Sequence, residues 1–183
     1  MASIWRSVVV SMLFTLFGGP GIVLVFIPWL VTRFSIPPGE PVALRAAGVI
    51  LISTGLALLL ESIWRFISMG RGTLVPTMPT ERLALSGLYR YVRNPMYVGV
   101  LTAIAGEALL MQSGGLATEF FAVGLAFELF VRLYEEPRLM RTFPEEYGVY
   151  QHHVRRWLPR LTPWDGGAQQ ARTFRGLAVS KEK

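Results

Sequence analysis

The stretch VALRAAGVILISTGLALLLESIWRFI, residues Val42–Ile67, decides the fold class because it is long and almost continuously apolar. A helix needs about 20 mostly apolar residues to cross the hydrocarbon core of a bilayer. This stretch meets that length, and its charged residues Arg45, Glu61 and Arg65 stand toward its two ends. Glu61 and Arg65 are also spaced to form an intrahelical ion pair. We therefore expect a transmembrane helix over these residues.

Three further segments have the same apolar character: Ser7–Val31, Pro95–Met111 and Leu116–Pro137. The first is interrupted by GGPG at Gly18–Gly21, where we expect a kink, because proline removes a backbone donor and glycine relaxes the chain. Splitting this segment gives a five-span alternative, but each half would be too short to cross. The sequence predicts an all-α integral membrane bundle of four transmembrane helices, with five as the alternative.

The links between these segments predict how the helices are oriented. QSGG at Gln112–Gly115 is short and uncharged, so the segments on either side must form an antiparallel hairpin. The long link before Pro95 and the region after the last span are both basic. The positive-inside rule places them in the cytoplasm, together with Arg6 near the N-terminus. A multi-pass protein with both termini cytoplasmic and an interfacial C-terminal segment follows.

Composition supports the membrane class. The 183 residues are 52% hydrophobic with a mean hydropathy of +0.43, and the net charge of +6 comes from groups that flank apolar segments. Such a distribution favours membrane lipids as partners over nucleic acid. The chain has no cysteine, and the adjacent His152 and His153 suit a shared metal site poorly, so no metal is expected. We predict one domain over residues 1–164 and a disordered polar tail over 165–183.

Four ionisable residues stand at helical spacing near the end of the last span: Glu128, Arg132, Glu135 and Glu136. A charge within a transmembrane segment costs on the order of 3 kcal/mol on insertion scales, so each requires a reason. One interpretation is a helix end at the interface, with Arg132 reaching water and the glutamates solvated. The other is a polar pocket in which the carboxylates hold a cationic ligand and the arginine orients a second ligand.

Three separated blocks of sequence carry a resemblance to a known family. The blocks are Gly87, Tyr89, Arg93, Asn94, Pro95, Tyr97 and Gly99, then Arg132, Glu135 and Glu136, then Phe143, Tyr147 and Tyr150. This pattern resembles the isoprenylcysteine carboxyl methyltransferase and phospholipid methyltransferase superfamily of integral membrane enzymes. The resemblance covers roughly Gly70–Pro159, about half of the chain.

The resemblance implies S-adenosylmethionine as methyl donor and S-adenosylhomocysteine as product, bound on the cytoplasmic side between the last two spans and the C-terminal segment. Glu135 or Glu136 would bind the amino group or ribose of the donor, and Arg132 would orient the acceptor near the reacting group. Arg132, Glu135 and Glu136 are thus the candidate catalytic residues. The remaining candidates for the cofactor pocket are Gly70, Gly72, Tyr89, Arg93, Asn94, Pro95, Tyr97 and Gly99.

The acceptor implied by the resemblance is lipid-like or prenylated, and it would enter from the bilayer. Asn94 stands where the prenylcysteine enzymes usually have histidine, which fits the bacterial and phospholipid-like members better and suggests a bacterial inner membrane. A carboxylate acceptor is already nucleophilic, whereas an amine must first lose a proton to Glu135 or Glu136. The alternative from another class is a non-enzymatic four-span protein, such as a transporter subunit that uses these charges for ions.

Overall fold

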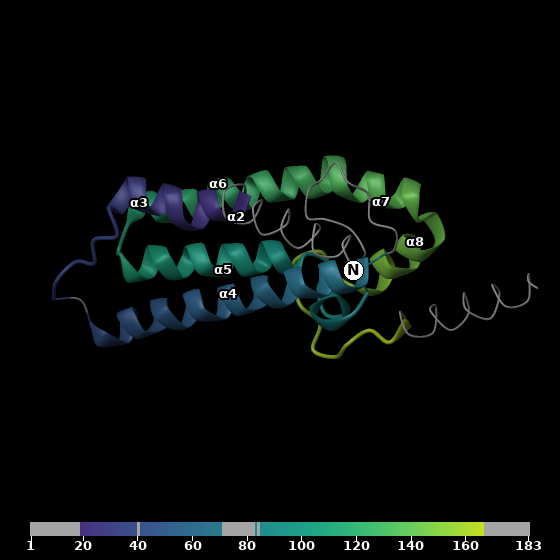
Figure 1. Cartoon of the computed structure of the whole chain (residues 1–183), viewed down its shortest axis with the longest axis horizontal. Helices are drawn as coiled ribbons and strands as arrows, with labels where there is room; N and C mark the ends of the chain where they lie inside the picture. Colours follow the sequence, from purple (N-terminus) through teal and green to yellow (C-terminus); the bar gives the residue numbers. More distant parts are fainter. Residues whose placement is uncertain (1–18, 40, 71–82, 84, 167–183) are drawn as a thin grey trace, which may run out of the picture.

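The computed structural model describes residues 19–39, 41–70, 83 and 85–166, and every regular element in this part of the chain is helical. Figure 1 shows α5 lying between α4 and α6, with the segments after α6 folding back toward one end of the bundle. The elements in chain order are α2 Gly19–Gly21, η1 Ile22–Phe26, α3 Ile27–Thr32, α4 Val42–Gly70, η2 Gly87–Arg90, α5 Pro95–Leu110, α6 Gly114–Phe130, η3 Val131–Glu135, α7 Glu136–Thr142 and α8 Pro144–His153.

The backbones of α4 and α5 touch each other where glycines meet. A Cβ atom on Gly55 would lie 2.5 Å from the backbone nitrogen of Ala103 and 2.6 Å from the carbonyl oxygen of Gly99. A Cβ atom on Gly106 would lie 2.7 Å from the carbonyl oxygen of Gly48. Small residues at such contacts allow the close approach that is common between membrane helices. The glycines therefore fix the position of α5, which carries part of the site described below.

The predicted hairpin between the last two apolar segments is confirmed. α5 ends at Leu110 and α6 begins at Gly114, so three residues make the turn. The Ser113 hydroxyl oxygen accepts a hydrogen bond from the backbone nitrogen of Leu116 and caps α6. α5 begins at Pro95, as the sequence predicted, because proline suits the first helical turn.

Two π-helical turns precede prolines in the helical segments. η1 ends with the backbone nitrogen of Ile27 bonded to the carbonyl oxygen of Ile22, directly before Pro28. η3 ends with the nitrogen of Glu136 bonded to the oxygen of Val131, directly before Pro137. Proline has no donor and clashes with the carbonyl four residues earlier, and a wider turn relieves that clash. Pro137 therefore disturbs the helix, as expected, but the chain stays helical to Thr142.

Among the described helices, Val42–Arg65 is the one long and apolar enough to span a bilayer, and only 17% of its apolar window is buried. Gly19–Thr32 and Pro95–Leu110 are apolar but shorter. The four-span bundle therefore stays a prediction, and residues 7–18 of the first expected span lie outside the described residues. α6 and η3 also present an exposed apolar stripe, formed by Phe121, Leu125, Leu129 and Leu133. Apolar faces of this extent mark contact with lipid or with another protein.

The segment that follows α8, residues 154–165, folds back onto the loop that precedes α5. We call this segment the C-terminal clamp. Its backbone accepts a hydrogen bond from the nitrogen of Arg93 to the oxygen of Arg155, at 2.9 Å. It also donates two, from Arg160 to Tyr91 at 2.9 Å and from Trp164 to Arg90 at 3.0 Å. Val154 and Trp164 of the clamp pack with Tyr147 and Tyr150 of α8 in one buried cluster. The clamp is thereby held against the end of the bundle.

Candidate active site

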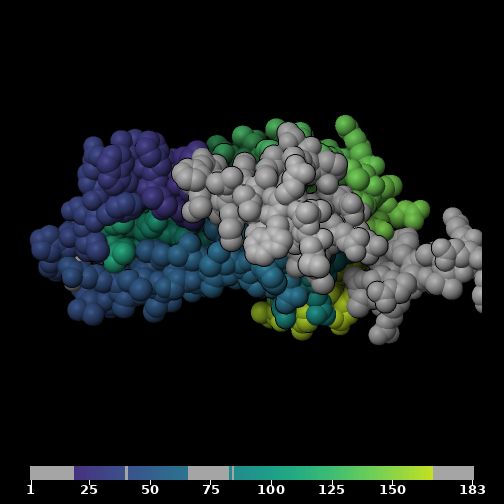
Figure 2. All heavy atoms as spheres, in the orientation of Figure 1, coloured from purple at the N-terminus to yellow at the C-terminus, as the bar shows by residue number. Residues whose placement is uncertain are grey.

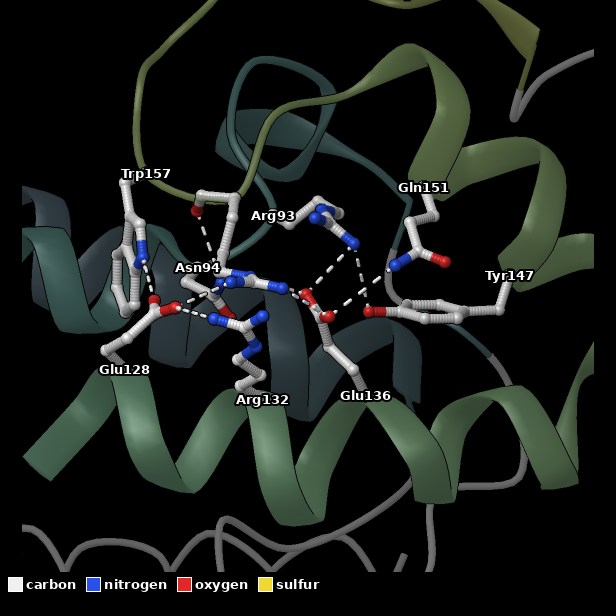
Figure 3. A network of polar contacts seen from close by, with 9 residues as sticks. Arg93, Asn94, Glu128, Arg132, Glu136, Tyr147, Gln151 and Trp157 are labelled. Atoms are coloured by element: carbon white, nitrogen blue, oxygen red, sulfur yellow. Dashed lines mark hydrogen bonds and ion pairs between the residues drawn. The ribbon is translucent and has the colours of Figure 1, made fainter.

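The carboxylate of Glu136 lies at the centre of a buried polar network at the cytoplasmic end expected for the bundle (Figure 3). Its Oε1 accepts a hydrogen bond from Arg156 Nε at 2.8 Å and lies 3.0 Å from Arg93 Nη1. Its Oε2 accepts a second bond from Arg156, from Nη2, at 2.7 Å. The hydrogen bond to Glu136 also raises the pKa of Arg156. Two guanidinium groups therefore neutralise one carboxylate.

Arg156 links Glu136 to a second carboxylate one helical segment earlier. Its Nη1 donates to Glu128 Oε1 at 2.8 Å, and the indole nitrogen of Trp157 donates to Glu128 Oε2 at 2.7 Å. Arg156 therefore bridges the two glutamates, which project from the same helical segment in Figure 3. The clamp thus supplies the guanidinium of Arg156 and the indole N–H of Trp157 to the glutamates on one face of α6 and α7.

The π turn η3 sets which acidic residues share this face. At 3.6 residues per turn, Glu128 and Glu136 would be offset around the helix by about 80°. The wider turn at Val131–Glu135 lets the two residues approach the same face. Glu135, one residue earlier than Glu136, then points elsewhere. The sequence left open whether Glu135 or Glu136 shares the face of Glu128, and in the structure it is Glu136.

Arg132 contacts Glu128 only at the limit of an ion pair. Its Nη1 lies 4.0 Å from Glu128 Oε1, and its side chain is 69% exposed. The predicted pairing of Glu128 and Arg132 along the helix is present, but the principal partner of Glu128 is Arg156. Arg132 consequently presents a largely free guanidinium at the edge of the site.

Glu135 forms a second cluster with aromatic residues. The Tyr97 hydroxyl donates a hydrogen bond to Glu135 Oε2 at 3.0 Å. The ring of Tyr97 lies 4.5 Å from that of Phe127 and 6.3 Å from that of Trp157, centroid to centroid. We call Tyr97, Phe127, Glu135 and Trp157 the aromatic–carboxylate cluster. It lies next to the Glu136 network because Trp157 belongs to both.

Tyr89 brings a buried hydroxyl to the same region. Its backbone oxygen accepts a hydrogen bond from the Tyr150 hydroxyl at 2.7 Å, which fixes the residue. Burial raises the pKa of Tyr89 well above its ordinary value, and the neighbouring charges of Tyr150 and Glu135 add to that rise. At this end of the bundle, the Tyr89 hydroxyl and Arg93 Nε are two of the buried side-chain atoms that have no hydrogen-bond partner among the described residues. Unsatisfied buried polar atoms are uncommon, so each marks a place for a ligand or water.

Comparison with known families decides the classification of this chain. The model of the family described as phospholipid methyltransferase matches residues 44–146, which is more than half of the 183 residues. The chain belongs to the phospholipid methyltransferase family. Comparison with curated proteins and with solved structures found no match.

Membership in this family identifies the chain as a membrane methyltransferase and confirms the resemblance that the sequence motifs suggested. The matched region contains Arg93, Tyr97, Glu128, Glu135 and Glu136. It ends before Arg156 and Trp157. The polar network of this methyltransferase therefore joins residues of the family region to Tyr147, Gln151, Arg156 and Trp157, which lie beyond it.

The other residues predicted to line the cofactor pocket contact the clamp or α4, stand at a helix end, or lie outside the described residues. The side-chain nitrogen of Asn94 donates to the backbone oxygen of Arg156 at 3.2 Å, which ties the clamp to the start of α5 at Pro95. Gly99 faces α4, because a Cβ atom there would lie 2.8 Å from both the Gly55 oxygen and the Leu59 nitrogen. Gly70 is the last residue of α4, and Gly72 lies outside the described residues.

Sequence reasoning did not select Arg156, Trp157 and Gln151 as site residues. Arg156 and Trp157 have the contacts given above, and the Gln151 amide nitrogen lies 3.5 Å from Glu136 Oε2. The Tyr147 hydroxyl, part of the family pattern, accepts from Arg93 Nη1 at 3.3 Å. One signal was present in the sequence. Three glutamates within one helix end need cations from another segment, and Arg155-Arg156-Trp157 follows the last tyrosine of the pattern closely.

Proposed function

We propose that the protein transfers a methyl group from S-adenosylmethionine to a lipid-like acceptor that enters from the bilayer. Membership in the phospholipid methyltransferase family supports methyl transfer in general. The cofactor assignment rests on a difference between two adjacent carboxylates in the partners that they already have. Glu136 is occupied by Arg93 and Arg156, whereas Glu135 accepts one hydrogen bond, from Tyr97, among the contacts of the described residues.

The residues present fit the polar groups of the cofactor. A carboxylate accepts about four hydrogen bonds, so Glu135 retains the capacity to bind an amino group or ribose hydroxyls. The unpartnered Tyr89 hydroxyl and Arg93 Nε supply further buried polar atoms beside it. The rings of Tyr97, Phe127 and Trp157 offer flat apolar surface for a purine. Glu135, Tyr89, Arg93 and the aromatic–carboxylate cluster are therefore the residues that would hold the cofactor.

Glu136 then has a structural task and Glu135 the ligand-binding one. A buried carboxylate is retained when it is paired and hydrogen-bonded, which Arg93 and Arg156 accomplish for Glu136. By holding Glu136, the two arginines place Glu135 toward Tyr97 on the neighbouring surface of the helix. This division of roles assigns the cofactor contact to Glu135.

The chemistry requires alignment and exclusion of water more than proton transfer. When bound, S-adenosylmethionine supplies a methyl carbon activated by a sulfonium. The protein has to hold the acceptor atom about 3 Å from that carbon and in line with it. Arg132, with its exposed guanidinium, is placed to orient an anionic group of the acceptor by two hydrogen bonds. For an amine acceptor, a carboxylate oxygen of Glu135 is the available base that takes the proton.

The topology proposed with this function is the four-span arrangement with both termini in the cytoplasm, in a bacterial inner membrane. Membrane integration is supported by the exposed apolar faces of α4 and α6 and by the one helix among the described residues that meets the length for a span. In this arrangement the site lies at the cytoplasmic interface, where a water-soluble cofactor and a bilayer-borne acceptor can meet. The non-enzymatic alternative is not favoured, because family membership points to a methyltransferase.

The test of this function uses the protein reconstituted in lipid nanodiscs with methyl-labelled S-adenosylmethionine. Phosphatidylethanolamine and a prenylated carboxylate are offered as acceptors in parallel. We expect label in the extracted lipid. Mild alkali then distinguishes the products, because a methyl ester releases the label as volatile methanol, whereas an N-methylated amine keeps it on the non-volatile headgroup. Label that stays entirely in the aqueous phase with both acceptors and with a total lipid extract would overturn the proposed function.

A further inference from the structure

The C-terminal clamp holds two apolar side chains outward on a fixed backbone. Leu161 is 101% exposed and Leu158 is 65% exposed. Three backbone hydrogen bonds anchor the clamp on both sides of these leucines, through Arg155, Arg160 and Trp164. A mobile loop tip would leave leucines exposed by chance, but a tethered segment presents them in a defined direction. The fold therefore holds these two leucines in fixed positions at the surface.

The same short segment alternates between the site and the outside. Arg156 and Trp157 point inward and bond to Glu128 and Glu136. Leu158 follows immediately and points outward, and Leu161 comes three residues later. Any contact that Leu158 and Leu161 make outside the protein would therefore affect the positions of Arg156 and Trp157 in the polar network.

The clamp lies at the depth where the apolar part of α4 ends. A Cβ atom on Gly87 would lie 2.6 Å from Glu61 Oε1 and 2.9 Å from Arg65 Nε, which places η2 beside the last turns of that span. The clamp is hydrogen-bonded to Arg90 and Tyr91, three and four residues after Gly87. In Figures 1 and 2 the clamp, in yellow, lies at the surface beside this end of α4. Trp64 is 66% exposed at the same level, and exposed tryptophan marks membrane interfaces.

The charge of the clamp identifies what it fits. Its cations are Arg155, Arg156 and Arg160, and its single acid, Asp165, is paired with Arg90. Arg156 is used inside the protein, which leaves exposed Arg155 before Leu158 and half-buried Arg160 between Leu158 and Leu161. Apolar side chains interspersed with cations are the composition that binds the boundary between acyl chains and anionic headgroups.

We propose that the clamp docks Leu158 and Leu161 into the anionic surface of the bilayer beside α4, and that this docking holds Arg156 and Trp157 in the site. The occupant of this surface is a layer of anionic phospholipid. The proposal concerns a lipid contact and does not require methyl transfer, so its outcome is separate from that of the proposed function.

The chain has no cysteine, so one introduced cysteine provides a single labelling site. Leu161→Cys is labelled with an environment-sensitive fluorophore in nanodiscs of phosphatidylcholine with or without phosphatidylserine. Val149→Cys is the matched control, since Val149 is a 44% exposed apolar residue on α8, which lies beyond the end of α4 in Figure 1. Headgroup spin-labelled lipid should quench the Leu161 probe at least about twofold more than the Val149 probe, and more strongly with phosphatidylserine, because the attraction is electrostatic in part.

A second variant tests the coupling to the site. Leu158→Ser with Leu161→Ser leaves every inward contact of the clamp in place, and Val149→Ser is its control. The double variant should show accelerated proteolysis after Arg155 or Arg160, severalfold over the control. Equal quenching at positions 161 and 149, or quenching at 161 by aqueous iodide alone, overturns the docking. Quenching at 161 by a second labelled copy, and not by lipid, overturns it in favour of a dimer contact.

Discussion

Arg156 meets Glu136 through two parallel hydrogen bonds, from Nε to Oε1 at 2.8 Å and from Nη2 to Oε2 at 2.7 Å. This is the bidentate geometry in which a guanidinium and a carboxylate bind best, and lysine cannot reproduce it. The third nitrogen, Nη1, reaches Glu128. One side chain from the clamp therefore fixes two carboxylates of the helix formed by α6, η3 and α7.

Replacing this arginine tests its role directly. Arg156→Gln should destabilise the protein by about 2 kcal/mol, the lower end for a buried charge pair, because the Arg156 side chain remains 23% exposed. Arg156→Lys should recover part of the loss, since it keeps the charge but not the fork. Thermal unfolding in detergent measures both. Arg155→Gln, one residue earlier and exposed, is the control, and equal losses at 155 and 156 would contradict the assignment.

The contact between α4 and α5 predicts a graded response to added methyl groups. Gly55→Ala and Gly106→Ala should each lower stability by about 1–3 kcal/mol, because the new carbon would meet backbone atoms at 2.5–2.7 Å and the helices must separate. Gly124→Ala is the matched control on α6, where the nearest atom is a leucine methyl at 3.8 Å. Chemical denaturation gives the comparison, and a Gly55→Ala variant as stable as Gly124→Ala would refute the close contact.

Alkaline pH should weaken the fold through Tyr147. Burial, with the charge of Glu136, raises the pKa of Tyr147 to about 12, whereas an unfolded tyrosine ionises near about 10. The folded state favours the neutral phenol, so this stabilisation is complete below about pH 10 and is lost as pH rises toward about 12. Tyr147→Phe should show a shallower loss of unfolding free energy over that window. Identical slopes for the two proteins would show that Tyr147 ionises normally.

Several elements could be predicted from local sequence because local chemistry determines them. The apolar run at Val42–Arg65 specifies α4, and Pro95 specifies the start of α5. The short polar link before α6 requires a hairpin. The pair of Glu61 and Arg65 follows from helical spacing and is present at 2.9 Å. Each of these features depends on residues within a few positions of one another.

The arrangement of the site depends on contacts that spacing does not encode. A regular helix would place Glu135 on the face of Glu128, but the π turn before Pro137 brings Glu136 there instead. Arg156 reaches the site only because the clamp is bonded to residues 90–93, more than 60 positions earlier in the chain. Gly99 belongs to the family pattern, yet its contact is with α4. Long-range packing decided these placements.

The most direct test of the central claim is the equilibrium binding of S-adenosylhomocysteine to the nanodisc-reconstituted protein, measured by calorimetry for wild type, Glu135→Gln and Glu145→Gln. Glu145 is exposed on α8 and serves as the control. We expect wild type and Glu145→Gln to bind alike and Glu135→Gln to bind about tenfold more weakly or worse, because a charged hydrogen-bond acceptor is lost. No binding by wild type, or unchanged binding by Glu135→Gln, would contradict the account.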